Sequence, residues 1–532
     1  MPLLPLQSPR VPRRSYAAQT AQVQVIPAPT GGLNYRDPIA AMTPLDALAL
    51  TNFIPRQQGV ELRKGYQTYA DPVGGNAVDA IFSYKAPVPA DDRIFTAVNG
   101  NIYDVTDGGT PVLAVTGTGS DSDEWWTTQF STPGDTFLLA VSPGAGYWTY
   151  STGTGWIDRT ATTTGLPTTV RTVAVWKQRV WFTAEGDSNV YYLNAVDVVT
   201  GACTSFAMGS TLRNGGYCSA LINWTMDAGF SIDDYLIVVG TEGDVGVWQG
   251  TDPTSADTFS LKGVWYVGPV PKHGTFFTPF GGDVMIVSEL GLVPMSKLVN
   301  GQYTQDQQIG PASKIQSVFA PLVRRLLDGL YFDVFVVPSS EVLVIKLPPD
   351  GGTYRQFAMN VTTGAWCQFV GIPMLSAAVI NGQLYFGTED GYTCKGLFGD
   401  KDGADALGDG GNYVEGDVQT SFQAFNTPQQ LKKFGMVRPT FISTAAPAIK
   451  LQMNTQFQLT PVGGSPFFTK DSGAVWDEGI WNTSTWVGTN TYQGWAGTTG
   501  LGYYGSLRMK VRGLPATVFT SCNVMTELGG VM

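Results

Sequence analysis

The most regular pattern in this chain is an apolar run, a turn that contains glycine, and a second apolar run. It is clearest in Asp233–Trp248, where Tyr235–Val239 and Val245–Trp248 flank a turn bounded by Gly240 and Gly243. β-Branched residues on both sides of a glycine turn predict a β-hairpin. The pattern recurs every 40 to 60 residues, with turn glycines at Gly100, Gly144, Gly186, Gly243, Gly291, Gly351 and Gly391.

This spacing predicts an all-β fold with a β-propeller, because a blade of four strands needs a repeat of roughly 40–60 residues. The glycines are consistent with six or seven blades, since the units at Gly291 and Gly351 are irregular and one of them is a candidate insertion. Strands that crowd a propeller axis need small side chains. Four apolar runs contain one and are assigned to innermost strands, at Ala80, Ala174, Ala220 and Ala378.

Two tryptophans open matching strands after a Thr-Gly turn, Trp156 in GTGWID and Trp366 in TTGAWC. We interpret both as packing between blades rather than as sugar-binding residues. Near the end of the chain, Ile449, Leu451 and Met453 alternate with polar residues. The same alternation occurs at 507–512. Such alternation predicts half-buried antiparallel strands with one solvated face.

These patterns divide the chain into five parts. Residues 1–30 are rich in Pro, contain three Arg and no acid, and predict an extended arm; 31–74 form a helix–strand docking segment. Residues 75–398 form the propeller, 399–417 an acidic Gly-rich linker, and 418–532 an antiparallel β-sandwich-like domain.

One short helix is expected in the docking segment. Thr43 is a capping residue, Pro44 occupies the first helical position and Asp46 adds an acid to the first turn. The helix is predicted over 44–53 and is ended by Pro55, and the alternation at 60–66 then predicts a strand.

Three ordered motifs give a specific resemblance. They are GGLN-x-x-DP at 31–38, M-x-P-x-DA-x-x-L-x-NF-x-P at 42–55 and V-x-LRKGY at 60–66. In this order they resemble the opening of tail nozzle (tail hub, DNA-stabilisation) proteins of short-tailed bacteriophages. The W-D-x-G-x-W stretch at 476–481 also resembles phage tail proteins. The three motifs cover under a tenth of the chain.

The resemblance implies a propeller chain of which six copies form a ring below the portal and its adaptor, closing the DNA exit channel. It implies a structural, non-enzymatic virion protein, made in the host cytoplasm and located in the tail. Its partners would be further copies of itself, the portal adaptor protein, tail fibres or tailspikes, and packaged double-stranded DNA in transient, non-specific contact.

Two groups of residues are candidates for these contacts. The arm and the expected helix are candidates for subunit or adaptor contacts, through Arg10, Arg13, Arg14, Leu48, Leu50 and Phe53. Loops at one end of the blades commonly form constrictions. The polar stretch NGQYTQDQQ therefore supplies channel-gate candidates, at Gln302, Tyr303, Gln305, Asp306 and Gln307.

Composition and charge agree with an assembled particle. Only 14% of the 532 residues are charged, against about 25% on average, which fits a surface partly covered by other subunits. The net charge of −11 excludes an overall basic footprint for nucleic acid, and an acidic channel would let DNA slide. Five cysteines without C-x-x-C spacing predict no disulfide framework. No apolar run is long enough to span a bilayer, and no secretion signal is expected.

Candidate chemistry is sparse, and neither an enzyme nor a cofactor is expected. His273 is the single histidine, and no nucleophile elbow, P-loop or dinucleotide motif occurs. The alternative reading is a receptor-binding or glycan-degrading tail propeller, whose acids would come from 121–124, next to Trp125 and Trp126. An Asp-box pattern at 469–476 occurs once. The D-x-D-G-x-D stretch at 400–405 resembles a calcium loop but lacks a placed bidentate acid.

Overall fold

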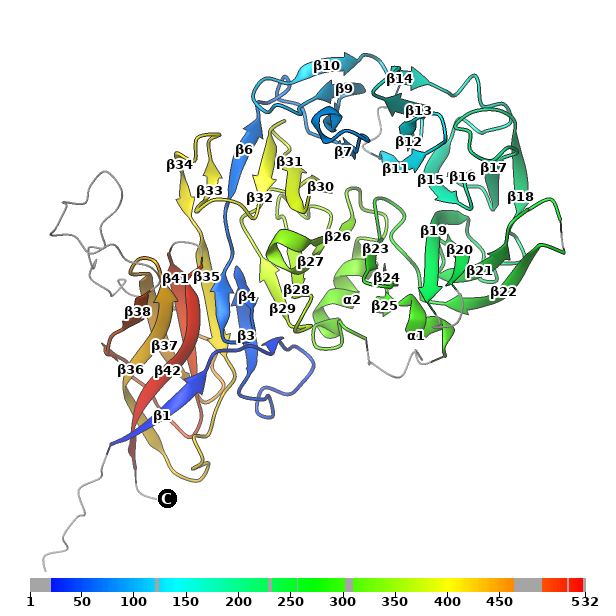
Figure 1. Cartoon of the computed structure of the whole chain (residues 1–532). Helices are drawn as coiled ribbons and strands as arrows, with labels where there is room; N and C mark the ends of the chain where they lie inside the picture. The colour runs from blue at the N-terminus through cyan, green and yellow to red at the C-terminus, as the bar shows by residue number, and fades with distance from the viewer. Residues whose placement is uncertain are drawn as a thin grey trace, which may run out of the picture.

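The computed structural model describes residues 21–119, 124–227, 232–255, 257–301, 310–463, 490–513 and 516–529. Figure 1 shows a ring of small sheets and, beside it, a second β unit that contains strands from both ends of the chain. The α-helices of the described residues, α1 (Met295–Val299) and α2 (Gln316–Arg325), lie between strands of the ring. Two 3-10 turns are at Pro89–Asp91 and Pro338–Ser340.

The ring is a β-propeller in which seven sheets follow one another in the described residues. Four sheets have four consecutive strands: β7 (Ala80–Tyr84), β8 (Arg93–Val98), β9 (Asn101–Asp104), β10 (Val112–Val115); β11 (Trp126–Ser131), β12 (Thr136–Ser142), β13 (Gly146–Ser151), β14 (Gly155–Asp158); β15 (Val170–Trp176), β16 (Arg179–Ala184), β17 (Asn189–Leu193), β18 (Cys203–Ala207); β19 (Cys218–Asp227), β20 (Ile232–Gly240), β21 (Asp244–Gly250), β22 (Phe259–Tyr266).

The other three sheets are less regular. The fifth has three strands, β23 (Phe277–Phe280), β24 (Asp283–Ser288) and β25 (Gly291–Pro294). The sixth has β26 (Asp333–Val337), β27 (Val342–Lys346), β28 (Gln356–Asn360) and β29 (Trp366–Phe369). The last has β30 (Ser376–Ile380), β31 (Gln383–Gly387) and β32 (Thr393–Gly396), and gains its fourth strand from an earlier part of the chain.

That fourth strand closes the ring. β6 (Tyr66–Ala70) precedes the first blade in sequence and pairs antiparallel with β32, with Gly396 opposite Tyr66 and Thr393 opposite Ala70. The first sheet and the last are thereby held together by one continuous stretch of chain. The closure removes an exposed sheet edge that would otherwise be available for aggregation.

The predicted hairpins are confirmed. Each of the seven turn glycines lies at the connection between the second and third strands of its sheet, including Gly291 and Gly351 in the irregular units. The four alanines lie on the first strands β7, β15, β19 and β30, which surround the axis. The propeller class is therefore confirmed: in the described residues four blades are separate four-stranded sheets, one has three strands, and the last two belong to larger sheets.

Packing between blades is also as expected. Trp156 lies 6.0 Å from Phe82 and 5.1 Å from Phe95, measured between ring centroids, and these two rings belong to the preceding blade. Trp366 is 1% exposed and its indole donates a hydrogen bond to the carbonyl of Pro311. Both tryptophans therefore fill the protein's own core.

The helix predicted over 44–53 is wrong. Its place is taken by β3 (Asp46–Thr51) and β4 (Phe53–Pro55), separated by Asn52 with φ of 58°. β3 pairs parallel with β2 (Gly32–Leu33) and antiparallel with β35 (Glu415–Thr420). So short a helix is marginal by itself, and β3 gains partners on both edges. The strand predicted at 60–66 is divided into β5 (Val60–Leu62) and the start of β6.

The linker predicted over 399–417 is an ordered part of the sheets. It contains β33 (Lys401–Ala404), β34 (Gly410–Tyr413) and the start of β35. β33 runs parallel to β6 and antiparallel to β34, so the stretch extends the last blade. The glycine and acid content of residues 399–417 indicated a loop. The stretch forms strands instead, because one edge of β6 is available to pair with β33.

The second unit consists of two sheets with a shared core. One contains β1 (Gln22–Pro27), β4, β5, β36 (Lys432–Ser443), β38 (Asn490–Gln493), β39 (Ala496–Gly497), β40 (Leu501–Gly502) and β42 (Val518–Leu528). The other contains β2, β3, β35, β37 (Ala448–Thr455) and β41 (Gly505–Arg512) and continues into the sixth blade through a β29–β3 pair.

Residues 418–532 therefore do not form this unit alone, because strands β1 to β5 complete its sheets. The end of the predicted arm is itself a strand, β1, paired with β42. The predicted alternation in the C-terminal region is confirmed: Leu507, Met509 and Val511 are fully buried, and the basic residues between them are half-buried.

Candidate functional site

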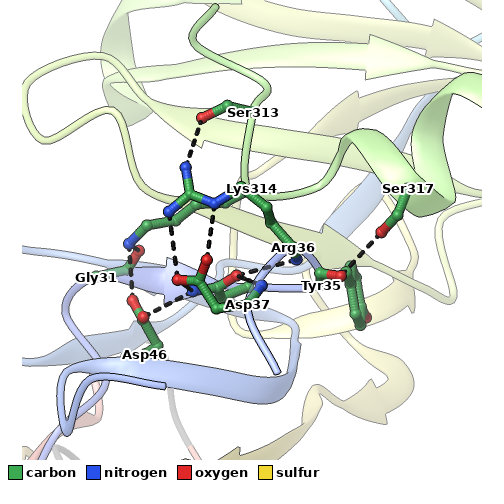
Figure 2. Close-up of polar contacts among 9 residues, drawn as sticks. Gly31, Tyr35, Arg36, Asp37, Asp46, Ser313, Lys314 and Ser317 are labelled. Carbon is green, nitrogen blue, oxygen red and sulfur yellow. Dashed lines mark hydrogen bonds and ion pairs between the residues drawn. The ribbon is translucent and has the colours of Figure 1, made fainter. Parts of the chain in front are cut away.

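The residues that carry the family resemblance converge on the joint between the propeller and the second unit. Asp46, at the start of β3, is 1% exposed and accepts hydrogen bonds from Asn34 at 2.8 Å and Lys314 at 2.7 Å. Lys314 also donates to the carbonyl of Gly31. Figure 2 shows these contacts, in which Lys314 precedes α2 of the propeller and its partners lead into the second unit.

A second polar cluster continues the same joint. Asn34 donates to Asp37, and Arg36 makes an ion pair with Asp37 at 2.8 Å. The Arg36 contact, followed by the Asn34 hydrogen bond, lowers the pKa of Asp37 to about 2. Arg36 also reaches Ser313 of the propeller (Figure 2).

Arg63 is the centre of the joint and is fully buried. Its guanidinium donates to both carboxylate oxygens of Asp402, at 2.8 and 2.7 Å, and to the carbonyl of Val370. Its Nε donates to Asn52. One side chain thus ties the motif segment to the sixth blade and to β33. A bidentate, buried pair of this kind specifies geometry strongly.

Two motif glycines are required by close approach of other backbone segments. At Gly32, where φ is 75°, an added Cβ would lie 2.6 Å from backbone atoms of Trp366. At Gly65 it would lie 2.0 Å from the carbonyl oxygen of Lys401. The motif residues named above therefore build the junction of the two units.

Only some of the predicted contact residues, and none of the predicted gate residues, lie in the described part of the chain. Leu50 and Phe53 are fully buried in the chain's own core, so their assignment as contacts to a neighbouring subunit is wrong. The error follows from the helix assignment, which would have left one face outside. Leu48 is half-buried. The remaining candidates lie outside the described residues: Arg10, Arg13, Arg14, Gln302, Tyr303, Gln305, Asp306 and Gln307.

A cavity with a volume of about 940 Å³ lies on the propeller axis. Most of its wall comes from the first strand of every blade, or from the residues just before it. Near the start of these strands each blade contributes one polar residue to the wall: Asp79, Glu124, Arg171, Ser219, Thr275, Asp333 and Ser376.

The single histidine contacts a residue of this wall. The carboxylate of Glu124 is hydrogen-bonded to the Nδ1 atom of His273. The same carboxylate lies 3.5 Å from the guanidinium of Arg171. Arg171 is 5% exposed and also donates to the hydroxyl of Tyr217. Sequence reasoning named Glu124 and His273 separately and missed Arg171, since the three residues come from different blades and share no local motif.

A second ion pair involves Asp333, which also belongs to the cavity wall. The ammonium of Lys346 is 3.4 Å from Asp333 and donates to the carbonyls of Tyr331 and Leu375. Burial raises the pKa of Asp333 to about 6 and lowers the pKa of Lys346. Asp333 and Lys346 lie on neighbouring strands of the sixth blade, and the hydrogen bond from Lys346 to Leu375 connects this blade to the seventh.

The other candidate chemistry is limited. Asp121, Asp123 and the stretches 469–476 and 476–481 lie outside the described residues. Asp402, in the calcium-like stretch, is paired with Arg63, and within the described ranges no group of three His, Cys, Asp or Glu is arranged to hold a metal ion. Burial raises the pKa of all five thiols, which are free: Cys203, Cys218, Cys367, Cys394 and Cys522.

The sheet topology defines the class of protein as a closed β-propeller joined to a second β unit. No helix in the described part of the chain is long and apolar enough to cross a membrane. No protein-family model matches the sequence, and no curated protein matches it.

Similar solved structures include propellers of unrelated sequence. BBS1N, solved in complex with ARL6DN, matches with a TM-score of 0.39 and 12% identity, over 63% of this chain and 98% of that one. The WD40 β-propeller domain of Doa1 gives 0.34 and 10%, over 62% and 96%. The computationally designed Ika8 protein gives 0.35 and 13%, over 62% and 100%. The propeller assignment rests on the chain's own sheet topology, and these likenesses carry nothing about function.

Proposed function

We propose that this chain is a structural subunit of a phage tail nozzle, a ring that closes the DNA exit channel below the portal and adaptor and lets the genome pass on ejection. The observation that carries the proposal is the ordered motif series at 31–66, which resembles the opening of tail nozzle proteins. In this chain the motif joins a propeller to a second β unit, so the resemblance concerns residues that organise the whole fold.

A DNA passage in such an assembly must run between copies of the chain. The axial cavity of about 940 Å³ has the size of a small-molecule pocket. The major groove of duplex DNA alone is about 12 Å wide. A cavity of this volume therefore has no room for a duplex along the propeller axis. A ring of several copies, six in the proposal, supplies the wider opening.

Charge supports a sliding contact with DNA. The chain has a net charge of −11, and repetition around a ring multiplies that charge. A tight phosphate contact needs clustered Lys and Arg, whereas an acidic wall repels the duplex and allows fast passage.

The proposal places the arm 1–30 against a neighbouring subunit or the adaptor, the polar stretch 302–307 at the constriction, and tail fibres or tailspikes on the outer surface.

Electron microscopy of the purified full-length protein tests the proposal. We expect closed rings with six-fold symmetry and an opening wide enough for duplex DNA, either alone or after addition of the adaptor protein. A monomer under both conditions, or a ring whose inner wall is lined by Lys and Arg, would contradict the proposal.

One observation favours the second candidate, a receptor-binding or glycan-degrading propeller in the tail. Glu124 and Trp126 both belong to the wall of the axial cavity, and acids next to aromatics are typical of sugar sites. Against cleavage, Glu124 is engaged by His273 and Arg171, and Asp333 by Lys346. Release of reducing ends from a polysaccharide would favour this candidate over the nozzle.

A further inference from the structure

We propose that the axial cavity of the propeller binds a short, neutral oligosaccharide and holds it without cleaving it. The inference concerns the inside of one propeller and does not depend on the proposed ring.

The cavity has a volume of about 940 Å³ and is bounded by every blade, within the roughly 300–1,000 Å³ of small-molecule sites. Its wall combines aromatic rings with hydroxyl-bearing side chains. Trp126 and Phe277 lie in the wall with ring centroids 5.6 Å apart. Such rings offer an apolar face to the C–H groups of a sugar.

The polar groups of the wall are mixed in kind, which selects a neutral ligand. Arg171 provides donors, while Glu124 and Asp79 provide acceptors. An anion would meet the carboxylates, and a cation would meet the guanidinium. A ligand rich in hydroxyl groups satisfies both, because each hydroxyl donates one hydrogen bond and accepts others.

An unpaired hydroxyl is the independent indication of a ligand. Ser219 belongs to the cavity wall and is 1% exposed, and its Oγ has no hydrogen-bond partner among the described residues. Buried side-chain hydroxyls are normally bonded, so an exception in a cavity wall calls for a partner. Ser219 and Arg171 both lie where the strand register shifts, at Cys218/Ala220 and Val170/Thr172. Such bulges re-aim side chains and occur next to binding sites.

The same wall argues against hydrolysis. A glycosidase needs one carboxylic acid that can donate a proton and a second carboxylate positioned to attack or to activate water. Glu124 lies between His273 and Arg171, and Asp333 is paired with Lys346. Asp79 accepts hydrogen bonds from the backbone of Asn99 and from Tyr331. Acids held in this way act as acceptors for sugar hydroxyls.

Saturation-transfer NMR and calorimetry with maltotriose, cellotriose and chitotriose test the proposal on the full-length protein. We expect at least one of the three to bind, with a dissociation constant that changes less than about 2-fold between low and high salt, because the ligand is uncharged. No binding of any of the three to folded protein overturns the proposal, as does release of reducing ends from a bound sugar.

Two variants place the sugar in the cavity. Ser83→Trp fills the cavity from β7 and should abolish binding, whereas Ser339→Trp, on an exposed turn outside the cavity, should leave it unchanged. Ser219→Ala removes one hydroxyl and should weaken binding by roughly 3- to 10-fold, the effect of a single hydrogen bond. Equal melting temperatures confirm that the variants are folded. Binding that survives in Ser83→Trp, or displacement of the sugar by spermidine or inorganic phosphate, contradicts the assignment.

Discussion

At the scale of single residues, buried charge is placed where separate parts of the chain meet. Arg63 and Lys346 are both fully buried, and each contacts backbone carbonyls as well as a carboxylate. An ion removed from water is costly unless its partners are well arranged. These two cations therefore fix the positions of the strands around them, Arg63 at the joint and Lys346 between two blades.

The Lys346–Asp333 pair makes a testable contribution to pH dependence. The pKa of Asp333 is raised to about 6 by burial, so between roughly pH 4 and 6 the folded chain keeps a proton that the unfolded chain has released. The stability contributed by Asp333 therefore increases as the pH falls through this window and is lost as the pH rises above 6. The double variant Asp333→Asn, Lys346→Met should lack this dependence.

The measurement is the free energy of unfolding in urea at several pH values for both proteins. The difference between wild type and double variant should move in favour of the wild type by about 1–3 kcal/mol from neutral pH to about pH 4. Other carboxylates titrate in the same range, and the difference removes their contribution. Parallel curves for the two proteins would show that Asp333 does not titrate in this window.

At the scale of elements, long periodic signals predicted correctly and short local signals did not. Apolar runs on both sides of Gly100 or Gly243 are hairpins because both strands bury their apolar residues in the same sheet. The Thr43-Pro44 cap signal was overridden by strand pairing at β3. The acidic stretch at 399–417 became β33 and β34 because β6 lay alongside. The strands β35 and β6, which pair with β3 and β33 respectively, are hundreds of residues away in the sequence. A pattern of neighbouring residues therefore contains no information about them.

The contact between β6 and β33 predicts a matched pair of glycine variants. Gly65→Ala places a Cβ 2.0 Å from the carbonyl oxygen of Lys401, where backbone must move, and should destabilise the fold by about 2–3 kcal/mol or more. Gly435→Ala, in β36, meets no atom within 4 Å and should change stability by less than about 0.5 kcal/mol. Chemical denaturation of both variants measures the difference. Equal stabilities would mean that the packing of β33 beside β6 tolerates separation of these strands.

At the scale of the whole molecule, the sequence predicted the propeller and its repeat, and it could not predict how the chain ends combine. The alternation at 507–512 correctly indicated antiparallel strands, yet nothing local indicates that β1 pairs with β42, about 500 residues away. The axial cluster is similar. Glu124, Arg171 and His273 lie in three separate turns of the repeat, and only ring closure brings them together.

The arm gives the last prediction, because it separates folding from assembly. The strands that complete the described sheets begin with β1 at Gln22, and the strand that closes the ring is β6. The triple variant Arg10→Ala, Arg13→Ala, Arg14→Ala should therefore keep the wild-type melting temperature. If the arm pairs with acidic surface on a neighbouring copy, the same variant should form several-fold fewer rings in electron micrographs, and wild-type rings should dissociate as salt screens the contact.

The matched triple variant with lysine in place of each arginine keeps the charge and should retain most ring formation, since an exposed charge contact needs no bidentate geometry. Unchanged ring formation in the alanine variant would exclude the arm from the interface, whereas a lowered melting temperature would show that the arm belongs to the fold.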